Sequence, residues 1–225
     1  MRYHNPVLLN KCISALSINP KGVYVDVTFG GGGHSSLILD HLTTGKLFAF
    51  DQDNNVNQNK LQHRSFKLIN ANFRYIKKFL KMEGVSKIDG LLADLGISSY
   101  HLDSPKRGFS IRFNSTLDMR MNASSELSAK EIINEYSEDC LSSLFYNYGD
   151  LKNSRKIAKA IVVQRKKKMI TTTFDLISIV SSLVGVKKKN QFLARVFQAI
   201  RIEVNDEIGA LKEMLYSAVE LLDHG

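Results

Sequence analysis

The sequence is poor in cysteine and has no long apolar run. Its 225 residues include two cysteines, Cys12 and Cys140, which lie far apart without a CxxC spacing or a nearby histidine pattern. We interpret both as buried thiols in a reducing cytosol rather than as metal ligands or nucleophiles, and we predict no metal site. The apolar runs are too short to span a bilayer and residues 1–6 do not resemble a signal peptide, so we expect a cytoplasmic protein without a membrane partner.

The formal net charge of the whole chain is +9, and acidic residues are scarce in one segment of it. Between residues 150 and 200, twelve Lys or Arg residues are accompanied by two acids, whereas the rest of the chain is almost neutral. A single lysine run is usually a solvated helix end or loop, but so localised an excess favours a polyanionic partner, of which nucleic acid is the first candidate. The length allows one α/β domain with an insertion or a small second domain.

The sequence also lacks the last glycine of a dinucleotide fingerprint. Residues 23–29 have a strand pattern and lead into four glycines, residues 30–33, after which residues 35–39 resemble a helix start. This order predicts a strand, a glycine turn and a helix, where bare backbone and free N–H groups can approach a ligand. The third glycine of G-x-G-x-x-G would fall at Ser35, which weakens an NAD or FAD site.

An acid follows the glycine turn at the distance of a ribose-binding residue. Residues 46–51 predict a second strand that ends in Asp51, about 20 residues after the turn. A glycine turn and a ribose acid without the third glycine suit S-adenosylmethionine (SAM) at least as well as a dinucleotide. A purely structural turn is the alternative to a cofactor site.

Apolar periodicity predicts four strand–helix units followed by a helical segment. The predicted strands are residues 23–27, 46–51, 66–71 and 88–96, and the helices that accompany them are residues 7–18, 35–42, 54–63 and 73–82. Residues 97–121 are irregular and long for a connection, which indicates a functional loop. Further helices are predicted at residues 128–136, 139–147, 154–167, 173–183 and 191–222, the first of them with a capping box at Ser128 and Glu131.

These elements predict an α/β fold, a Rossmann-like open parallel sheet with an all-helical insertion after the fourth strand. We expect a cofactor-binding α/β domain in residues 1–100 and a basic, RNA-contacting helical insertion in residues 101–190. Residues 191–225 are expected to form a long helix that returns to the sheet. A doubly wound sheet would normally continue with another strand after such a helix, so we expect the sheet to be incomplete at its C-terminal end.

Six motifs, taken in order, resemble the signatures of one family. They are residues 4–9 (HNPVLL), 26–34 (DVTFGGGGH), 93–99 (ADLGISS), 107–110 (RGFS), 117–121 (LDMRM) and 197–207 (FQAIRIEVNDE). They cover the chain from end to end and closely resemble the RsmH family, also called MraW. The resemblance implies a methyltransferase that uses SAM to methylate the exocyclic N4 of a P-site cytidine, cytidine 1402, of 16S rRNA in the small ribosomal subunit.

The same resemblance implies which residues contact the cofactor. The positions that match the family's SAM contacts are Gly32, Gly33, His34, Asp51, Phe73 and Asp94. His101 stands where family members usually have glutamine, and it can still donate or accept a hydrogen bond. The alternative role for His34 is a helix-start residue that bonds backbone, and the alternative role for Phe73 is a core residue.

Family members continue beyond the position of Gly225 with a strand and a Ser-Phe-His-Ser-Leu-Glu-Asp segment, neither of which is found here. We therefore expect a truncated or degenerate copy of the family. Full activity of these 225 residues is then a separate and weaker expectation than membership of the family.

Methyl transfer from a sulfonium is an in-line displacement, so the enzyme mainly positions its reactants. The N4 amine of cytosine is a poor nucleophile because its lone pair is delocalised into the ring. We expect Asp94 to anchor the cofactor, and backbone carbonyls or the hydroxyls of Ser98 and Ser99 to orient the amine. Ordinary turn and cap roles are the alternative for the two serines.

The target base has to be unpaired or flipped before the enzyme can reach its amine. The helical insertion is predicted to bind the RNA through the basic runs 165–168 and 187–189. The loop after the fourth strand carries four further charged residues, Arg107, Arg112, Asp118 and Arg120. Its arginines either hold RNA phosphates or form salt bridges that shape the loop.

Three other functions compete with this prediction. A non-catalytic SAM- and RNA-binding ribosome assembly factor, or an inactive fragment, would bind SAM without transferring its methyl group. A DNA amino-methyltransferase shares the cofactor and the reaction, but the Pro-Pro-aromatic turn common in those enzymes is absent here. A nicotinamide dehydrogenase fits least, because the third glycine and a hydride-transfer acid–base pair are absent. The sequence does not indicate an oligomeric state.

Overall fold

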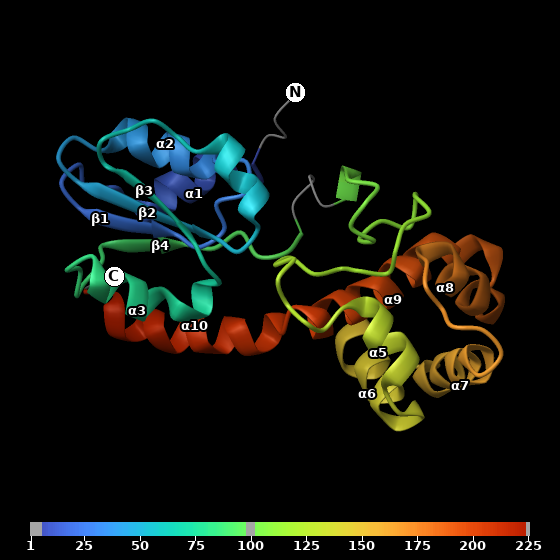
Figure 1. The fold of residues 1–225 in the computed structure, drawn as a ribbon. Coiled ribbons are helices and arrows are strands. Elements are labelled where there is room, and N and C mark those ends of the chain that lie inside the picture. The colour runs from blue at the N-terminus through green and yellow to red at the C-terminus, as the bar shows by residue number, and fades with distance from the viewer. Residues whose placement is uncertain (1–5, 98–101, 224–225) are drawn as a thin grey trace. The chain divides into compact units, whose positions relative to one another are not determined.

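The computed structural model describes residues 6–97 and 102–223, which form two compact units (Figure 1). Unit 1 comprises Met1–Ser98 and Ile208–Gly225, and unit 2 comprises Ser99–Glu207. Unit 1 is therefore built from two separate stretches of the chain, and unit 2 from one continuous stretch.

Unit 1 contains a four-stranded parallel sheet in the order β3-β2-β1-β4, which confirms the predicted α/β fold. The strands are β1 (Val23–Asp26), β2 (Lys46–Asp51), β3 (Phe66–Asn70) and β4 (Gly90–Leu92). The fourth strand is shorter than the predicted 88–96. Beyond Leu92, the Asp94 N–H donates to the hydroxyl of Thr28 instead of extending the ladder with β1.

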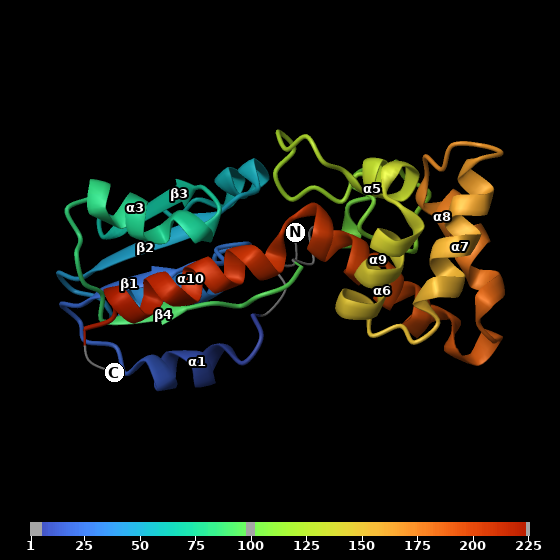
Figure 2. The ribbon, with the colours of Figure 1, turned by 90° about the horizontal axis from the view of Figure 1, so that it is seen from below.

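Alternate residues of the strands point to opposite faces of the sheet, and helices cover both faces (Figure 2). Tyr24 and Leu47 pack with α1 (Leu9–Leu16) and α2 (Gly33–His41). Val25 and Phe48 point the other way, toward α3 (Ile76–Met82) and α10 (Glu207–Leu221).

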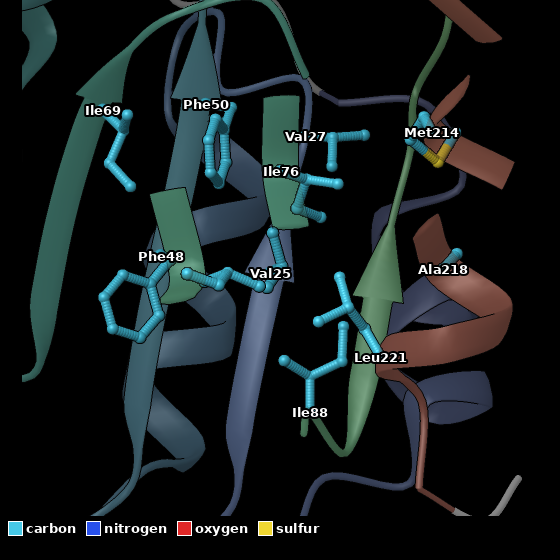
Figure 3. Packing of buried hydrophobic residues seen from close by; sticks show 11 residues of the cluster. Val25, Val27, Phe48, Phe50, Ile69, Ile76, Ile88, Met214, Ala218 and Leu221 are labelled. Carbon is cyan, nitrogen blue, oxygen red and sulfur yellow. The ribbon is translucent and has the colours of Figure 1, made fainter. Parts of the chain in front are cut away.

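The helix α10 completes the second of these cores (Figure 3). Its Met214, Ala218 and Leu221 pack in the same cluster as Val25 of β1. The end of α10 also reaches the start of the fourth strand, because the Ile88 N–H donates to the carbonyl oxygen of Leu221 at 2.9 Å.

Two helices predicted in unit 1 are partly or wholly 3-10 helices. Residues 54–63 were expected to form an α-helix, but the structure has the 3-10 helix η1 (Asn54–Asn59). The buried Asp53 accepts hydrogen bonds from the backbone and side chain of Asn55, which favours a tight turn over a regular helix. The predicted helix 73–82 begins with a single 3-10 turn, η2 (Phe73–Tyr75), and continues as α3.

Unit 2 is helical, and its helices lie close to the predicted ranges. They are α5 (Ala129–Glu135), α6 (Glu138–Gly149), α7 (Ser154–Arg165), α8 (Thr173–Val180), followed by η3 (Ser181–Leu183), η4 (Val186–Lys188) and α9 (Lys189–Val204). The capping box of Ser128 and Glu131 before α5 is confirmed. A second capping box, Thr172 with Asp175, begins α8. Such caps remove unpaired N–H groups at the helix start.

The single helix predicted for residues 191–222 is two helices. The helix α9 ends at Val204 and α10 begins at Glu207, because Asp206 has a positive φ of 45° that no α-helix can accommodate. The bend is held by Arg201, whose Nε and Nη2 donate to the two carboxylate oxygens of Glu207 at 2.7 and 3.0 Å.

The prediction that both cysteines are buried is wrong. Cys140 is exposed and Cys12 is half-buried. Cys140 lies in the first turn of α6, outside the buried stripe formed by Leu141, Leu144 and Phe145. None of the helices described is both long enough and apolar enough to cross a membrane.

Candidate functional site

The buried carboxylate of Asp26 ties the end of β1 to the helix that follows. Asp26 is 1% exposed. Its Oδ1 accepts the N–H of Thr28 at 3.0 Å, and its Oδ2 accepts the hydroxyl of Ser35 at 2.7 Å. Burial raises the pKa of Asp26, and the hydrogen bonds from Ser35 and Thr28 offset only part of that effect. The prediction from sequence missed this residue, although an acid within an apolar strand was a visible signal.

The raised pKa of Asp26 makes stability depend on pH. A raised folded-state pKa contributes stability below the ordinary value of 3.8, which is lost as the pH rises through the folded pKa. Asparagine does not titrate, so the stability of Asp26→Asn lacks this pH dependence. As the pH rises from 3.8 to the folded-state pKa, we expect the free energy of unfolding of Asp26→Asn to increase relative to that of the wild type, by about 1.4 kcal/mol per unit of pKa shift. Urea unfolding of both proteins between pH 4 and 8 measures the difference. A difference that does not change with pH would contradict the expectation.

The glycine turn between β1 and α2 has conformations and contacts that other residues would disturb. Gly30 and Gly32 have positive φ angles of 51° and 77°. A Cβ at Gly32 would lie 2.9 Å from the ring of Phe29, and one at Gly33 would lie 2.3 Å from Pro6. Other residues are therefore disfavoured in this turn, which leads into the N-terminus of α2.

His34 follows the glycine turn in the first turn of α2. Its side chain is buried, and its Nε2 lies 3.1 Å from the carbonyl oxygen of Val7, to which it donates. This is a bond to backbone, as in the alternative role considered for His34, although its partner is distant in sequence. His34 thereby fixes the segment before α1 against the glycine turn.

Asp51 lies beside the glycine turn, at the carboxyl end of the neighbouring strand β2. Its Oδ2 accepts the N–H of Gly30 at 2.9 Å, and its Oδ1 accepts the N–H of Asp53 at 2.9 Å. The two bonds fix the carboxylate at the edge where ligands of open α/β sheets bind.

Asp94 reaches the same edge from the strand on the other side of β1. Its N–H donates to the hydroxyl of Thr28 at 2.8 Å, and that hydroxyl lies 3.3 Å from Oδ1 of Asp26. The side chain of Asp94 is exposed. Backbone and hydroxyl bonds thus place three acids, Asp26, Asp51 and Asp94, around the carboxyl ends of three adjacent strands.

Phe73 lies in η2, which follows the edge strand β3. It lies three residues after Asn70, which is paired with Asp51 in the sheet register. Its ring is half-buried and packs against the core that α3 and α10 cover. This position is compatible both with a core role and with a cover for a bound ring. The other predicted site residues, Ser98, Ser99 and His101, lie outside the described residues.

The charged residues of the loop in unit 2 are engaged with the loop itself. Arg120 donates to both carboxylate oxygens of Asp118, at 2.9 and 2.8 Å, and to the carbonyl of Ser125. Burial raises the pKa of Asp118, but hydrogen bonds from Arg120 outweigh it and the pKa is lowered. Arg107 donates to the carbonyls of Arg120 and Met121.

Arg112, the third arginine of this loop, donates to Asp103 at 2.6 Å. Of the two roles considered for these arginines, loop shaping is therefore the one that the observed contacts serve.

A single side chain of α9 holds the same loop in place. The Oδ1 of Asn205, the residue that caps the C-terminal end of α9, accepts the N–H of Met121 at 2.6 Å. Its Nδ2 donates to the carbonyls of Met119 and Arg201, both at 2.8 Å. Met119 is fully buried and has a positive φ of 58°, a strained conformation for a side-chain-bearing residue. The hydrogen bonds of Asn205 therefore offset part of the energetic cost of that strain.

Comparisons with known proteins agree on one family. A family model described as the MraW methylase family matches residues 1–225. The ribosomal RNA small subunit methyltransferase H of Christiangramia forsetii is 51% identical over 226 residues, which cover 100% of this chain and 75% of the relative. The protein of the same name from Cytophaga hutchinsonii is 51% identical over 99% of this chain and 76% of its own length. The protein of the same name from Flavobacterium johnsoniae is 50% identical over 100% of this chain and 75% of its own length.

Proposed function

The chain belongs to the MraW methylase family of methyltransferases, and we propose that it transfers the methyl group of SAM to the exocyclic N4 of a P-site cytidine, cytidine 1402, of 16S rRNA in the small ribosomal subunit. The observation that supports this proposal best is the hydrogen bond from the Gly30 N–H to Asp51, which joins the glycine turn to the ribose acid. These are the two parts that the sequence predicts for a nucleoside-containing cofactor.

The described residues at this edge of the sheet fit SAM. The glycine turn leads into the N-terminus of α2 at this edge, where backbone N–H groups can bind a ligand. The Asp51 carboxylate is held in place and can accept ribose hydroxyls. Asp94 presents an exposed carboxylate and Phe73 a half-buried ring from the two flanking strands.

SAM supplies a methyl group on a positively charged sulfur, and the protein positions the acceptor. In this proposal Asp51 binds the ribose, Phe73 covers the adenine, Asp94 anchors the remainder of the cofactor, and His34 holds the turn by its bond to Val7. Ser98 and Ser99 orient the cytosine amine so that its lone pair is available, and His101 takes the place of the family's glutamine. The unpaired base enters at this edge.

The proposal is tested with the 225-residue protein, methyl-labelled SAM and small ribosomal subunits that lack the modification. The rRNA is then digested and the methylated nucleoside identified by mass. We expect N4-methylcytidine at one site of 16S rRNA. Label on a different base, or on DNA rather than rRNA, would overturn the proposed substrate.

SAM binding is measured alongside by calorimetry, since it separates two ways in which transfer can fail. Tight SAM binding without transfer would overturn the catalytic proposal in favour of a non-catalytic SAM- and RNA-binding assembly factor. Absence of SAM binding would overturn the proposed cofactor site itself.

A further inference from the structure

One face of α7 carries exposed cations for which no ion pair is found among the described residues. The cations on this face are Arg155, Lys156 and Lys159, and the chain continues beyond the helix with Lys166, Lys167 and Lys168, all of them exposed. In the part of the chain that the structure describes, only Lys168 of this set forms an ion pair, with Asp175 at 3.7 Å. Intramolecular salt bridges therefore do not explain the other five.

The opposite face of α7 fixes these cations on a rigid support. Ile157, Ala158 and Ile161 are fully buried. Arg155 and Lys159 are four residues apart on the exposed side, which places them one above the other, about 6 Å apart along the helix axis. The result is a cluster of cations on a regular helix rather than on a loose tail.

The positions of Arg155 and Lys156 oppose helix stability. Among the described helices of unit 2, α5, α6 and α8 have acids in their first turn, which suit the positive end of the helix dipole. The helices α7 and α9 have none there, and in α7 Arg155 and Lys156 follow Ser154 in the first turn. Basic residues at a helix start are unfavourable by a few tenths of a kcal/mol each, so helix formation does not account for them.

An exposed aromatic residue follows these cations in the sequence. Phe174, in the first turn of α8, is 46% exposed. The next residue, Asp175, forms the ion pair with Lys168. The neighbouring Met169 is also exposed. Cations along a track with an aromatic side chain beside it are the combination that binds single-stranded nucleic acid, through phosphates and through stacking on bases.

We propose that the exposed face of α7, the lysine run 166–168 and Phe174 form the surface by which unit 2 binds a single-stranded segment of the substrate RNA. We name it the α7 surface. Its cations bind consecutive phosphates and Phe174 stacks on an unpaired base. The proposal rests on the proposed function, in that the RNA is the rRNA that is methylated, and it adds where and in which form the protein holds that RNA.

The test measures binding of a labelled RNA of about 20 nucleotides from the P-site segment of 16S rRNA, by fluorescence anisotropy over a range of salt concentrations. The charge variant is Arg155→Gln/Lys156→Gln/Lys159→Gln. We expect it to bind about 10-fold more weakly or worse near 0.1 M salt. Its slope of log K against log salt should be shallower by about 2, since each phosphate contact on a single strand contributes about 0.7.

The matched control is Lys78→Gln/Lys81→Gln/Lys212→Gln, which removes three exposed lysines from unit 1. It changes the net charge equally, and we expect less than a twofold change in RNA affinity. Equal losses in the two triple variants would overturn the proposal, because they would reflect net charge alone. An unchanged salt slope in the α7 variant would overturn it as well.

Phe174→Ala tests the stacking part separately. We expect about 10-fold weaker binding of the single strand with an unchanged salt slope, and no change for the same RNA annealed to its complement. Phe174→Tyr should restore the affinity. Equal losses on the single strand and the duplex would overturn stacking.

SAM affinity and methylation of small subunits distinguish this inference from the proposed function. If the wild type methylates rRNA and the α7 variant does so with an unchanged KM, the proposal that the α7 surface binds RNA is wrong and the proposed function stands. If the wild type methylates small subunits but does not bind the isolated RNA, the proposal for the α7 surface is wrong and the proposed function stands. If the proposal is correct, the α7 variant binds SAM normally and methylates with a raised KM.

Discussion

Replacing Asp51 with alanine is expected to weaken SAM binding at least 100-fold. The change removes the acceptor for ribose hydroxyls, and it also removes the carboxylate that accepts the N–H of Gly30 at 2.9 Å. Gly30 has a positive φ of 51°, and without that hydrogen bond the turn loses a direct restraint on its conformation. Hydrogen bonds to a charged group contribute about 1.5–3 kcal/mol each. Losing the bond to the ribose and the bond to Gly30 therefore corresponds to a loss of affinity of about 100-fold or more. Isothermal titration calorimetry with SAM measures it.

Two further variants show which part of the loss comes from the ribose. Asp51→Asn keeps one acceptor oxygen and loses the charge, so we expect an intermediate loss of about 10-fold. Asp40→Ala removes an exposed acid from α2 in the same unit and should leave SAM affinity unchanged. An affinity of Asp51→Ala within threefold of the wild type would rule out Asp51 as the ribose ligand.

Replacing Asn205 with alanine is expected to destabilise unit 2 by about 3 kcal/mol, because three hydrogen bonds are lost at once and buried groups are left unpaired. The N–H of Met121 and the carbonyl of Met119 lose their bonds to the amide, whereas the carbonyl of Arg201 still accepts the backbone N–H of residue 205 at 3.1 Å. Met119 and Met121 are buried, so water cannot readily replace the amide. Urea unfolding measures the global effect, and hydrogen exchange of the peptide covering residues 117–121 measures the local one.

The control for this variant lies on the same helix. Asn190→Ala removes an exposed asparagine near the start of α9 and should leave stability unchanged or slightly higher, because alanine favours helix formation. If Asn205→Ala unfolds like the control and its loop exchanges no faster, the arginines of the loop alone hold Met119 in its strained conformation.

Local sequence patterns predicted those parts of the fold that depend on neighbouring residues. The strand 46–51 was placed correctly, because its apolar run and final acid are visible without knowing the fold. The capping box before α5 was found for the same reason, since Ser128 and Glu131 are three residues apart. The glycine turn and Asp51 were likewise identified, and the structure places them in contact.

The features that sequence patterns did not reveal depend on distant partners. The break between α9 and α10 depends on the positive φ of Asp206, and the adjacent Asn205 bonds Met119 and Met121, which lie more than 80 residues earlier in the chain. The early end of β4 depends on a hydroxyl from Thr28, 66 residues away. The role of Arg107 is hidden from the sequence for a similar reason. Its partners are backbone carbonyls, which every residue has, so no sequence pattern marks them. For Phe73, the ring's position leaves both predicted roles available.

The return of α10 to the sheet has a consequence for biosynthesis. All four strands have been translated once the ribosome passes Leu92, yet one apolar face of the sheet is completed only when Met214, Ala218 and Leu221 arrive. At typical elongation rates that interval is roughly 10 s, long compared with the collapse of a small chain. Unit 2 is translated within this interval and is continuous, so it can fold first. The nascent sheet meanwhile exposes Val25, Phe48 and their neighbours, and the yield of folded protein will depend on how well that face is shielded until translation reaches α10.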